Sequence, residues 1–577
     1  MTTPRFVTAL LALCLLVGTA AAAGKITPGM ISCETYAVRD LFGAGKLTPE
    51  TFPAFCKAHG ITGVCFNDFF LRSWDEGYLA GIKNAVAKAG CVVTGVIRDG
   101  DLAGVPDADL PKVVEECKMK LRGAAYLGAP AMRINVGGTG DEQRDATEGV
   151  QKVAKVFNEL LPLARQLKVK LTIENHGGVS RSAENILAII KATDPEWVGS
   201  CLDFGNWPDE VRYESCRKLA PHAFVTHAKL RVFDAQGEDP NIDGCRILAI
   251  LRHAGYKGAL SIEFEGPGDQ EVGVIRSRDL LLRYWPAGSS GDTWSEIMPK
   301  GARVEKVAGG FQFTEGPVWA PMTIALDGRG ASRNQGALFF TDVRTNEVWS
   351  WDGKPRRILS GSRGANGLAF AGQGLLACRG GAGDLARIAP NGMVTPLVSE
   401  YQGRRFNSPN DLALGPGGAV YFTDPIFGGT RVQPVEGVYR LAADGQVALL
   451  VSDMAKPNGV AISRSGIKLY VADSAQAKVR AYDLDEQGKA GAGYDFATGI
   501  AGTPDGMALD CRGNLYVAAG GGVWVFDADG NRLGVIKTPE EPTNCAFGGT
   551  DGKTLFITAR TSVYRIRLGI AGMPQAS

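Results

Sequence analysis

The pattern of hydrophobic positions changes character near the middle of the chain. In the first half, short apolar runs alternate with longer segments of helical period, such as residues 151–167, which place their apolar residues on one face. Eight such strand–helix units within about 260 residues predict a (β/α)8 TIM barrel over residues 24–286. The predicted strands begin near Met30, Thr62, Cys91, Ala131, Val169, Val198, Phe224 and Ala259.

In the second half the helical pattern disappears, and short apolar runs are separated by glycines and turns. Six times, a residue with a side-chain oxygen precedes an apolar run, a turn and a second apolar run. These units recur about every 40 residues, which is the length of a propeller blade, so they predict an all-β six-bladed β-propeller over residues 303–577. The polar, small-residue segment 287–302 is the predicted linker. The six residues are Glu315, Asn366, Asn410, Asn458, Asp505 and Asn544.

Residues 1–23 have the layout of a cleaved signal peptide, with one arginine, an apolar core and small residues at the end. The apolar core is too short for a mature membrane anchor, so we expect a periplasmic or secreted protein without a membrane span after cleavage. An uncleaved anchor is the alternative. Eleven cysteines follow the signal segment, none with CxxC spacing, and the sequence assigns no disulfide.

The charge balance argues against nucleic acid as a partner. The chain has 62 basic and 61 acidic residues, a net charge of +1, and no long run of one sign. A small-molecule partner is favoured, and the sequence does not indicate an oligomeric state.

The six polar residues of the second half predict a binding site on the propeller axis. Equivalent positions of successive blades meet around the central channel, where carboxylate and amide oxygens suit a hard divalent cation such as Ca²⁺, Mg²⁺ or Mn²⁺. All five histidines lie in the first half, which excludes a histidine-based triad in the propeller. The alternative is that these residues only cap turns through their own backbone.

The segments FTEGPVW, NSPNDLAL, PNGVAIS and TPDGMALD resemble the SMP-30/gluconolactonase/LRE family of six-bladed propellers, over residues 303–568. The resemblance implies hydrolysis of a sugar lactone with a divalent metal (Ca²⁺, Mg²⁺, Mn²⁺ or Zn²⁺). It implies metal ligation by Glu315, Asn458 and Asp505, with Asp505 also the general base. Asn410, and with it Asn366, would bind the substrate.

One segment departs from that family. Where many members have an acidic residue, a histidine and a glycine, this chain reads CRGGAGDLAR, Cys378–Arg387. The departure puts the substrate in question, and we expect Arg379 to help select it.

Four consecutive predicted barrel strands end with a residue that can bind metal: Glu174, Asp203, His227 and Glu263. Because catalytic groups of a TIM barrel gather at the carboxyl ends of its strands, these residues predict a mixed oxygen and nitrogen site for Mn²⁺, Co²⁺, Mg²⁺ or Zn²⁺. Two glutamates on opposite sides of a ketose could also move a proton between neighbouring carbons. Taken singly, each residue could be a solvated loop charge.

This half is similar to the xylose isomerase-like sugar isomerase/epimerase barrels, across about residues 26–285. The resemblance implies that these four residues bind the metal and that Glu174 and Glu263 form the acid/base pair. Lys229 and Arg231 would meet substrate oxygens. Asn206 stands where many members have a second histidine.

The sequence therefore predicts an exported, two-domain carbohydrate enzyme, a metal-dependent lactonase propeller fused to a metal-binding barrel of the isomerase/epimerase type. One alternative makes one domain catalytic and the other a carbohydrate-binding or docking module. Another makes the propeller an arylesterase or organophosphate hydrolase, since the same ring of oxygens suits any polarised carbonyl or phosphoryl group.

Overall fold

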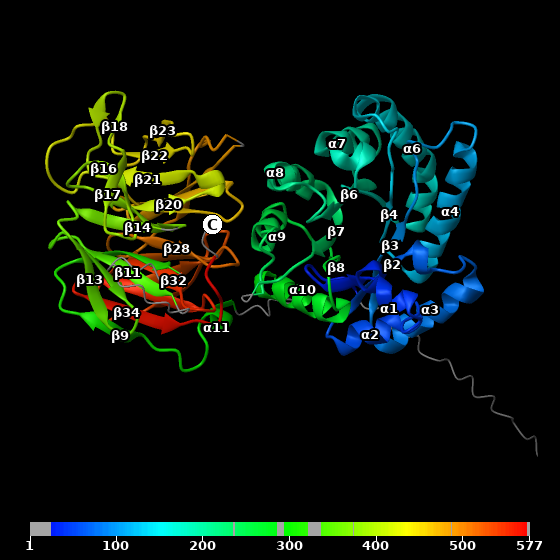
Figure 1. The fold of residues 1–577 in the computed structure, drawn as a ribbon, viewed down its shortest axis with the longest axis horizontal. Coiled ribbons are helices and arrows are strands. Elements are labelled where there is room, and N and C mark those ends of the chain that lie inside the picture. The colour runs from blue at the N-terminus through cyan, green and yellow to red at the C-terminus, as the bar shows by residue number, and fades with distance from the viewer. Residues whose placement is uncertain are drawn as a thin grey trace, which may run out of the picture.

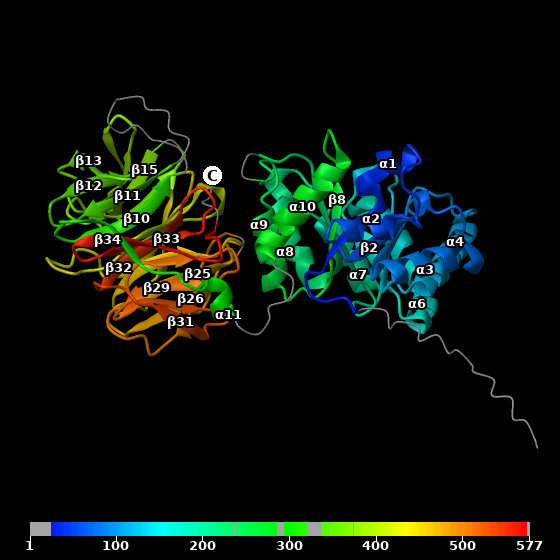
Figure 2. The ribbon, with the colours of Figure 1, turned by 90° about the horizontal axis from the view of Figure 1, so that it is seen from below.

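The computed structural model describes residues 25–234, 237–285, 293–320, 336–372, 374–485 and 487–573. They form two domains side by side, a barrel followed by a propeller (Figures 1 and 2). The proposed signal peptide, residues 1–23, lies outside the described residues. Within the described part, no helix is both long enough and apolar enough to cross a bilayer.

The first domain is a closed barrel of eight parallel strands in the order β1 to β8, which confirms the predicted TIM barrel. The strands are β1 (Ile31–Glu34), β2 (Gly63–Asn67), β3 (Val92–Arg98), β4 (Ala131–Ile134), β5 (Lys170–Glu174), β6 (Val198–Asp203), β7 (Ala223–Leu230) and β8 (Leu260–Phe264). The helices are α1 (Arg39–Gly43), α2 (Phe52–Ala58), α3 (Glu76–Ala89), α4 (Leu110–Leu127), α5 (Glu142–Arg144), α6 (Val150–Leu167), α7 (Ala183–Ala192), α8 (Asp209–Leu219), α9 (Gly244–His253) and α10 (Gln270–Tyr284).

Helix α6 illustrates how the sequence pattern builds the barrel wall. Its residues Val153, Phe157 and Leu160 are fully buried against the sheet, as the 3.6-residue period predicts. The helix ends at Leu167, and Lys168 after it adopts a left-handed conformation before strand β5 begins.

The second domain consists of six four-stranded antiparallel sheets, which confirms the six-bladed propeller. The first three blades are β10 (Thr314–Ala320), β11 (Ala337–Asp342), β12 (Glu347–Trp351) and β13 (Pro355–Ser360); β14 (Ala365–Ala371), β15 (Gly374–Arg379), β16 (Asp384–Ile388) and β17 (Val394–Val398); and β20 (Leu412–Leu414), β21 (Val420–Asp424), β22 (Gly437–Leu441) and β23 (Val447–Val451). The last three are β24 (Pro457–Ile462), β25 (Lys468–Asp473), β26 (Lys478–Asp483) and β27 (Tyr494–Ala497); β28 (Met507–Leu509), β29 (Leu515–Ala519), β30 (Gly522–Phe526) and β31 (Arg532–Ile536); and β32 (Pro542–Gly548), β33 (Thr554–Ala559), β34 (Ser562–Arg567) and β9 (Glu305–Gly309).

The first strand of the propeller closes the last blade, because β9 pairs with β34. The innermost strands β10, β14, β20, β24, β28 and β32 each contact the next around the ring. An additional pair, β18 (Glu400–Tyr401) and β19 (Arg404–Arg405), leaves the ring between the second and third blades.

The second half of the predicted linker is ordered on the propeller. Helix α11 (Thr293–Ile297) packs on β31, where a β-carbon at Gly534 would collide with the Trp294 ring. The Gly569 N–H also donates to the Ile297 carbonyl oxygen at 3.0 Å. Residues 286–292 lie outside the described residues.

Helices α8, α9 and α10 form the side of the barrel that faces the propeller (Figures 1 and 2). Arg252 of α9 donates to the Cys511 carbonyl oxygen at 2.7 Å, and Arg464 of the propeller forms an ion pair with Asp243 of the barrel. The eleven cysteines of the described residues are all buried and free.

Candidate metal centres and active sites

The structure brings the four predicted barrel residues together at the carboxyl end of the barrel. Glu174, Asp203, His227 and Glu263 come from β5, β6, β7 and β8 and are all buried. One ligand atom from each lies within 4.8 Å of those of the other three. Three carboxylates and an imidazole at this spacing can hold a divalent cation.

Each glutamate of this group contacts a cationic or ionisable partner. The His227 Nδ1 atom lies 2.5 Å from Glu174 Oε1 and 3.1 Å from Glu263 Oε2. Lys229 Nζ, also buried, lies 3.0 Å from Glu263 Oε1 and donates to Asn206 Oδ1 at 3.0 Å. Asn206, the residue that stands where the sequence resemblance implies a histidine in many related barrels, thus holds Lys229 in place.

The environments of Glu174 and Asp203 push their pKa values in opposite directions. Burial opposes ionisation of Glu174, but the Arg133 guanidinium and His227 outweigh it and hold its pKa well below the usual range. For Asp203, burial dominates and raises the pKa to about 8 although Lys229 opposes it. Such a contrast between neighbouring carboxyl groups is common at functional sites.

Unpartnered polar atoms support a cation at this position. Within the described residues, Asp203 Oδ2 and His227 Nε2 are buried and have no hydrogen-bond partner. Buried polar atoms are rarely left unsatisfied in native proteins, so a bound cation explains these two atoms. The residues present therefore fit the metal that the sequence predicts.

Two further barrel residues at this site were not predicted from the sequence. Arg133 of β4 forms a buried ion pair with Glu174, and Glu34 Oε2 at the end of β1 lies 4.0 Å from His227 Nδ1. Burial, with Glu263 nearby, raises the pKa of Glu34 to about 8. Applying the strand-end rule to all eight strands would have found Glu34, since it ends β1 as Glu174 ends β5.

Arg231 and His176 lie at the barrel rim. The Arg231 side chain is exposed, and its backbone N–H donates to Asp239 Oδ2 at 2.9 Å. His176 is also exposed. Of the two basic residues predicted to meet the substrate, only Lys229 lies inside the cluster.

In the propeller, the six predicted residues stand at the start of the innermost strands. Glu315, Asn366, Asn458 and Asn544 lie within β10, β14, β24 and β32, while Asn410 and Asp505 lie two residues before β20 and β28. In four blades the next residue is glycine, where the adjacent blade comes very close. A β-carbon would lie 2.1 Å from Asn366 O at Gly316, 2.8 Å from Asn410 O at Gly367, 2.0 Å from Asp505 O at Gly459 and 1.8 Å from Asn544 Cγ at Gly506.

The third blade has Asp411 in place of that glycine, a residue the sequence reading did not single out. Its Oδ2 accepts the Val460 N–H of the fourth blade at 3.2 Å. Burial raises the pKa of Asp411 to about 7. Its position in the polar–glycine repeat was the available signal.

The carboxyl groups near the propeller axis repel one another. Burial and then the charge of Asp505 raise the pKa of Glu315, and burial and then Asp411 raise that of Asp505. Asn458 Oδ1 and Asn366 Oδ1 are buried and have no hydrogen-bond partner within the described residues. Repelling carboxylates beside unpartnered amide oxygens fit a bound divalent cation.

Arg379 lies one strand out from the axis. Its guanidinium forms a bidentate pair with Asp384, at 2.7 Å and 2.6 Å, and its backbone is opposite Ala365, next to Asn366. The arginine is therefore buried and held by its own blade.

A cavity of about 1150 Å³ lies between the two domains on the propeller axis. The innermost strands of all six blades line it, and barrel residues such as Asp209, Asn241 and Asp243 cover it. Its lining includes Asp411 and Asn544 but none of Glu315, Asn458 and Asp505.

Together the fold and these clusters define a two-domain protein in which a TIM barrel and a six-bladed propeller each carry a group of buried acidic side chains. The chain belongs to the SMP-30/Gluconolactonase/LRE-like family, whose model matches residues 313–561. The model described as xylose isomerase-like TIM barrel matches residues 53–284.

Named relatives match the propeller half. A gluconolactonase of Zymomonas mobilis subsp. mobilis is 34% identical over 307 residues, spanning 47% of this chain and 83% of that protein. Pentonolactonase XacC of Haloferax volcanii is 28% identical over 266 residues, spanning 42% and 80%. A solved structure of a gluconolactonase from Xanthomonas campestris is 30% identical, covers 48% of this chain and 92% of its own, and has a TM-score of 0.43.

Proposed function

We propose that the propeller hydrolyses a sugar lactone with a divalent cation held by Glu315, Asn458 and Asp505. The observation that carries the proposal is the buried, unpartnered Asn458 amide oxygen in the same ring as two carboxyl groups whose pKa values are raised. Relatives named as gluconolactonase and pentonolactonase support the substrate class.

The reaction adds water to the lactone carbonyl carbon and breaks the ring carbon–oxygen bond, giving an open hydroxy acid. A divalent cation bound there supplies charge stabilisation for the carbonyl oxygen. Asp505 takes a proton from the attacking water and returns it to the departing ring oxygen. Burial, and then the charge of Asp411, raise the pKa of Asp505 well above its usual range, so this carboxyl group holds a proton more tightly than an exposed aspartate does.

Asn410 and Asn366 are placed to bind substrate hydroxyl groups at the same end of the ring. The Asn366 carbonyl oxygen accepts the Thr341 hydroxyl at 3.0 Å, and the Asn410 N–H donates to the Thr423 carbonyl oxygen at 2.9 Å. These bonds fix both backbones, and the amide side chains would bind the substrate. Arg379, paired with Asp384 in the neighbouring strands of the second blade, would help select the substrate.

We propose a second function for the barrel, a sugar isomerase or epimerase with a divalent metal held by Glu174, Asp203, His227 and Glu263. A cation there orients the substrate and polarises its carbonyl group. Glu263 and Glu174 would remove and return a proton at a substrate carbon. Lys229, 3.0 Å from Glu263 Oε1, would bind a substrate oxygen.

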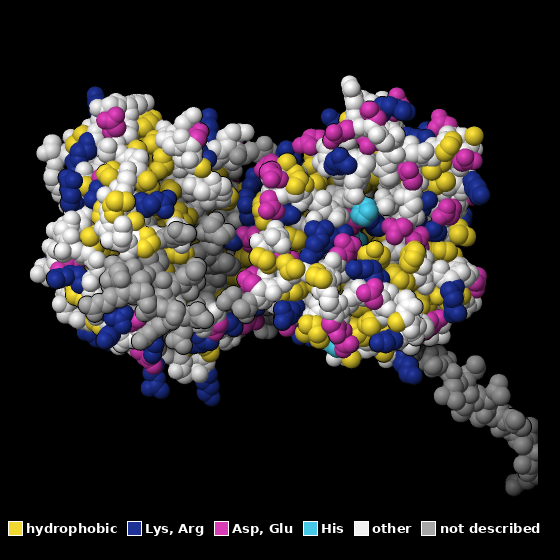
Figure 3. All heavy atoms as spheres, viewed as in Figure 1, with side chains coloured by type: hydrophobic (Ala, Val, Ile, Leu, Met, Phe, Trp, Pro, Cys, Tyr) yellow, Lys and Arg dark blue, Asp and Glu magenta, His cyan; other side chains and the backbone are white. Residues whose placement is uncertain are grey.

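The protein would act in the periplasm or outside the cell, on the evidence of residues 1–23. Its partner would be a small sugar or sugar lactone. Positive and negative side chains are mixed over the visible face of the barrel, which supports a partner other than nucleic acid (Figure 3). If the barrel lacked activity, it would serve as a carbohydrate-binding module. Hydrolysis of arylesters or organophosphates is the alternative reaction for the propeller.

The test is a panel of aldonolactones, arylesters and organophosphates assayed on the full chain with and without chelator. We expect chelator-sensitive lactone hydrolysis, and we expect Asp505→Asn to lower kcat/KM by about 10²- to 10⁴-fold because the general base is lost. Glu263→Gln should leave lactone hydrolysis intact and lower the metal content of the barrel.

Asp444→Asn, an exposed aspartate in the same domain, is the matched control and should behave as the native protein. Retained hydrolysis in Asp505→Asn would overturn the role given to Asp505. Preference for arylesters over every lactone would favour the alternative reaction.

A further inference from the structure

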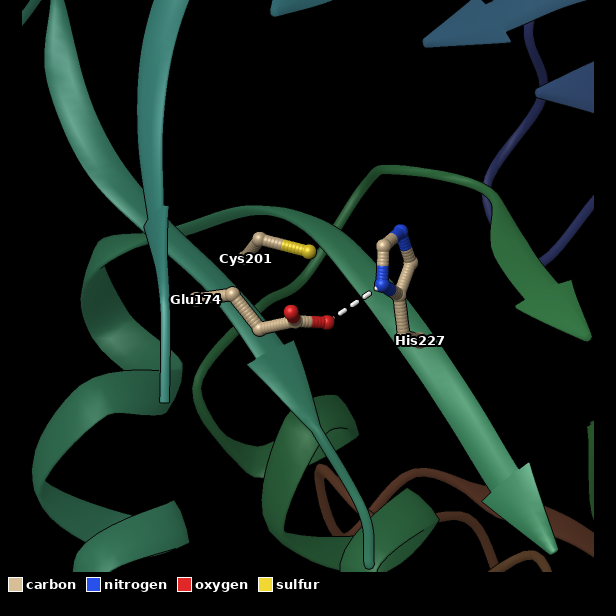
Figure 4. A group of neighbouring side chains, drawn as sticks. All are labelled: Glu174, Cys201 and His227. Atoms are coloured by element: carbon tan, nitrogen blue, oxygen red, sulfur yellow. Dashed lines mark hydrogen bonds and ion pairs between the residues drawn. The ribbon is translucent and has the colours of Figure 1, made fainter. Parts of the chain in front are cut away.

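Cys201 lies deeper in the barrel than the four proposed metal ligands and, with two of them, forms a second group of possible ligands. Cys201 of β6, with Glu174 and His227, places one ligand atom of each residue within 4.8 Å of the others. Figure 4 shows the Cys201 sulfur and the Glu174 carboxylate pointing toward the His227 ring. All three side chains are at most 2% exposed.

The strand geometry explains why this group lies deeper than the first. Cys201 precedes Asp203 by two residues, so both side chains point into the barrel, and Cys201 is one layer closer to the amino-terminal end. Its backbone is paired with that of Glu174 across β5 and β6. Its apolar neighbours Ala131 and Val225 lie inside the barrel as well.

We propose that the barrel has a second metal position, formed by Glu174, Cys201 and His227, that binds a thiophilic divalent cation such as Zn²⁺ or Co²⁺. The inference rests on the proposed metal site of the barrel and extends it. His227 Nε2, which also supports the upper site, is buried and has no hydrogen-bond partner within the described residues.

The difference between the two positions is the type of donor atom. The upper group consists of three carboxylates and an imidazole, which suits Mg²⁺ and Mn²⁺, whereas a thiolate favours softer ions such as Zn²⁺. When the cation binds, the Cys201 thiol loses its proton to solvent and a sulfur–metal bond replaces the sulfur–hydrogen bond. No change in oxidation state is involved.

The two positions exclude each other because they share Glu174 and His227. A thiophilic ion in the deeper position leaves Asp203 and Glu263 without a metal between them. The choice of ion would therefore decide which carboxyl groups face the substrate. Zn²⁺ in the deeper position would compete with Mn²⁺ in the upper position, although the two ions bind at different places.

The test uses Co²⁺ as the probe with the full-length, metal-stripped protein. Sulfur ligation gives an intense near-ultraviolet sulfur-to-cobalt charge-transfer band, which oxygen and nitrogen ligands do not give. We expect this band in the native protein and its loss in Cys201→Ser. Cys201→Ser should also weaken Zn²⁺ binding by at least about tenfold.

Two variants separate the proposal from its alternatives. Asp203→Asn should keep the band, since Asp203 belongs to the upper group only. Cys117→Ser, a buried cysteine of α4 outside the cluster, should keep it as well. If Cys201→Ser fails to fold by circular dichroism, Cys201→Ala replaces it, and the native spectrum alone still decides whether sulfur binds.

The outcomes distinguish this proposal from the proposed function. Co²⁺ bound at the barrel without a charge-transfer band overturns the deeper position and leaves the upper site standing. A band that persists in Cys201→Ser places the sulfur elsewhere and also overturns it. If mass spectrometry finds no Co²⁺ on the barrel at all, both the deeper position and the proposed upper site fail.

Discussion

At the residue scale, the glycines of the innermost propeller strands position the residues beside them. Gly459 directly follows Asn458, and the carbonyl oxygen of Asp505 in the next blade occupies the space of its missing β-carbon. The blade that carries one proposed ligand is thereby packed against the blade that carries another. Close backbone approach is the physical reason for the polar–glycine repeat.

We expect Gly459→Ala to displace Asp505 and so to weaken both the fold and the site. The new methyl group would lie 2.0 Å from a backbone oxygen, and relieving that overlap should destabilise the propeller by about 1–3 kcal/mol. A shift of about 1 Å at a catalytic group can cost 10²-fold in rate. Urea unfolding and lactone kinetics measure the two effects.

The control for this variant is Gly428→Ala, an exposed glycine with open space around its missing β-carbon. It should change stability by less than about 0.5 kcal/mol. Equal losses in the two variants would contradict the packing argument.

Predictions from the sequence were most complete for residues at regular positions. Glu174, Asp203, His227 and Glu263 each lie at or near a strand end, so topology alone brings them together. The sequence did not indicate Cys201 as a possible ligand, because the inward layer that a strand residue joins depends on barrel packing. Arg133 was missed because it does not end its strand, and Asp411 was missed because it stands where four other blades have glycine.

At the element scale, an aspartate at the end of the second strand of a blade holds the turn before the innermost strand. Asp424, which ends β21, accepts the N–H groups of Asn407 and Ser408 at 2.8 Å and 2.7 Å. Asp342 and Asp473 bind the corresponding turns of the first and fourth blades. This explains the repeated TD and AD endings of the sequence.

Asp424 should make propeller stability depend on pH. Burial raises its pKa to about 6 in the folded chain, above the unfolded value near 3.8, so the folded state binds the proton more tightly. The contribution of Asp424 to the free energy of unfolding is fully present below about pH 4 and is lost as the pH rises through about 6. Urea unfolding of the metal-free protein at pH 4.5 and 6.5 should show the decrease.

Asp424→Asn should make that decrease smaller, since an amide does not ionise in this range. Asp444→Asn, at an exposed position of the same domain, should keep the native slope. An unchanged slope in Asp424→Asn would assign the pH dependence to other groups.

Helices and strands were predicted correctly where their apolar residues recur at a regular spacing. All eight barrel strands and the two innermost strands of each blade gave clear apolar runs. Helix α11 was not predicted, because its five residues are too few for a helical period and its stability comes from packing on β31. The β18–β19 pair was not predicted either, because two residues in each strand are too few to give a recognisable strand pattern.

At the scale of the whole molecule, the two domains are joined by polar contacts around the central cavity. Arg464, in the turn after β24, forms an ion pair with Asp243, and Arg512 forms one with Glu296 of α11. The first pair crosses between the domains, while the second holds the connection to the propeller.

We expect Arg464→Glu to loosen the domains from each other. It places a second carboxylate beside Asp243 at a site where both side chains are less than a quarter exposed. Calorimetry of the full chain should show that the midpoint temperature of the first unfolding transition falls by about 2–4 °C for each kcal/mol of stability lost. Arg404→Glu, an exposed site on β19, should leave both transitions unchanged, and a fall there of similar size would contradict the interface argument.

The closure of the ring by β9 also limits where the chain can be divided. β9 is the outer strand of the sixth blade, although it precedes the first blade in sequence. A fragment that starts at residue 313, where the family match begins, would leave β34 as an unpaired edge. Such an edge can accept a strand from another copy, so this fragment would be prone to strand exchange and aggregation. A division before α11 keeps the sixth blade whole, and this is where the two domains could be separated as independent units.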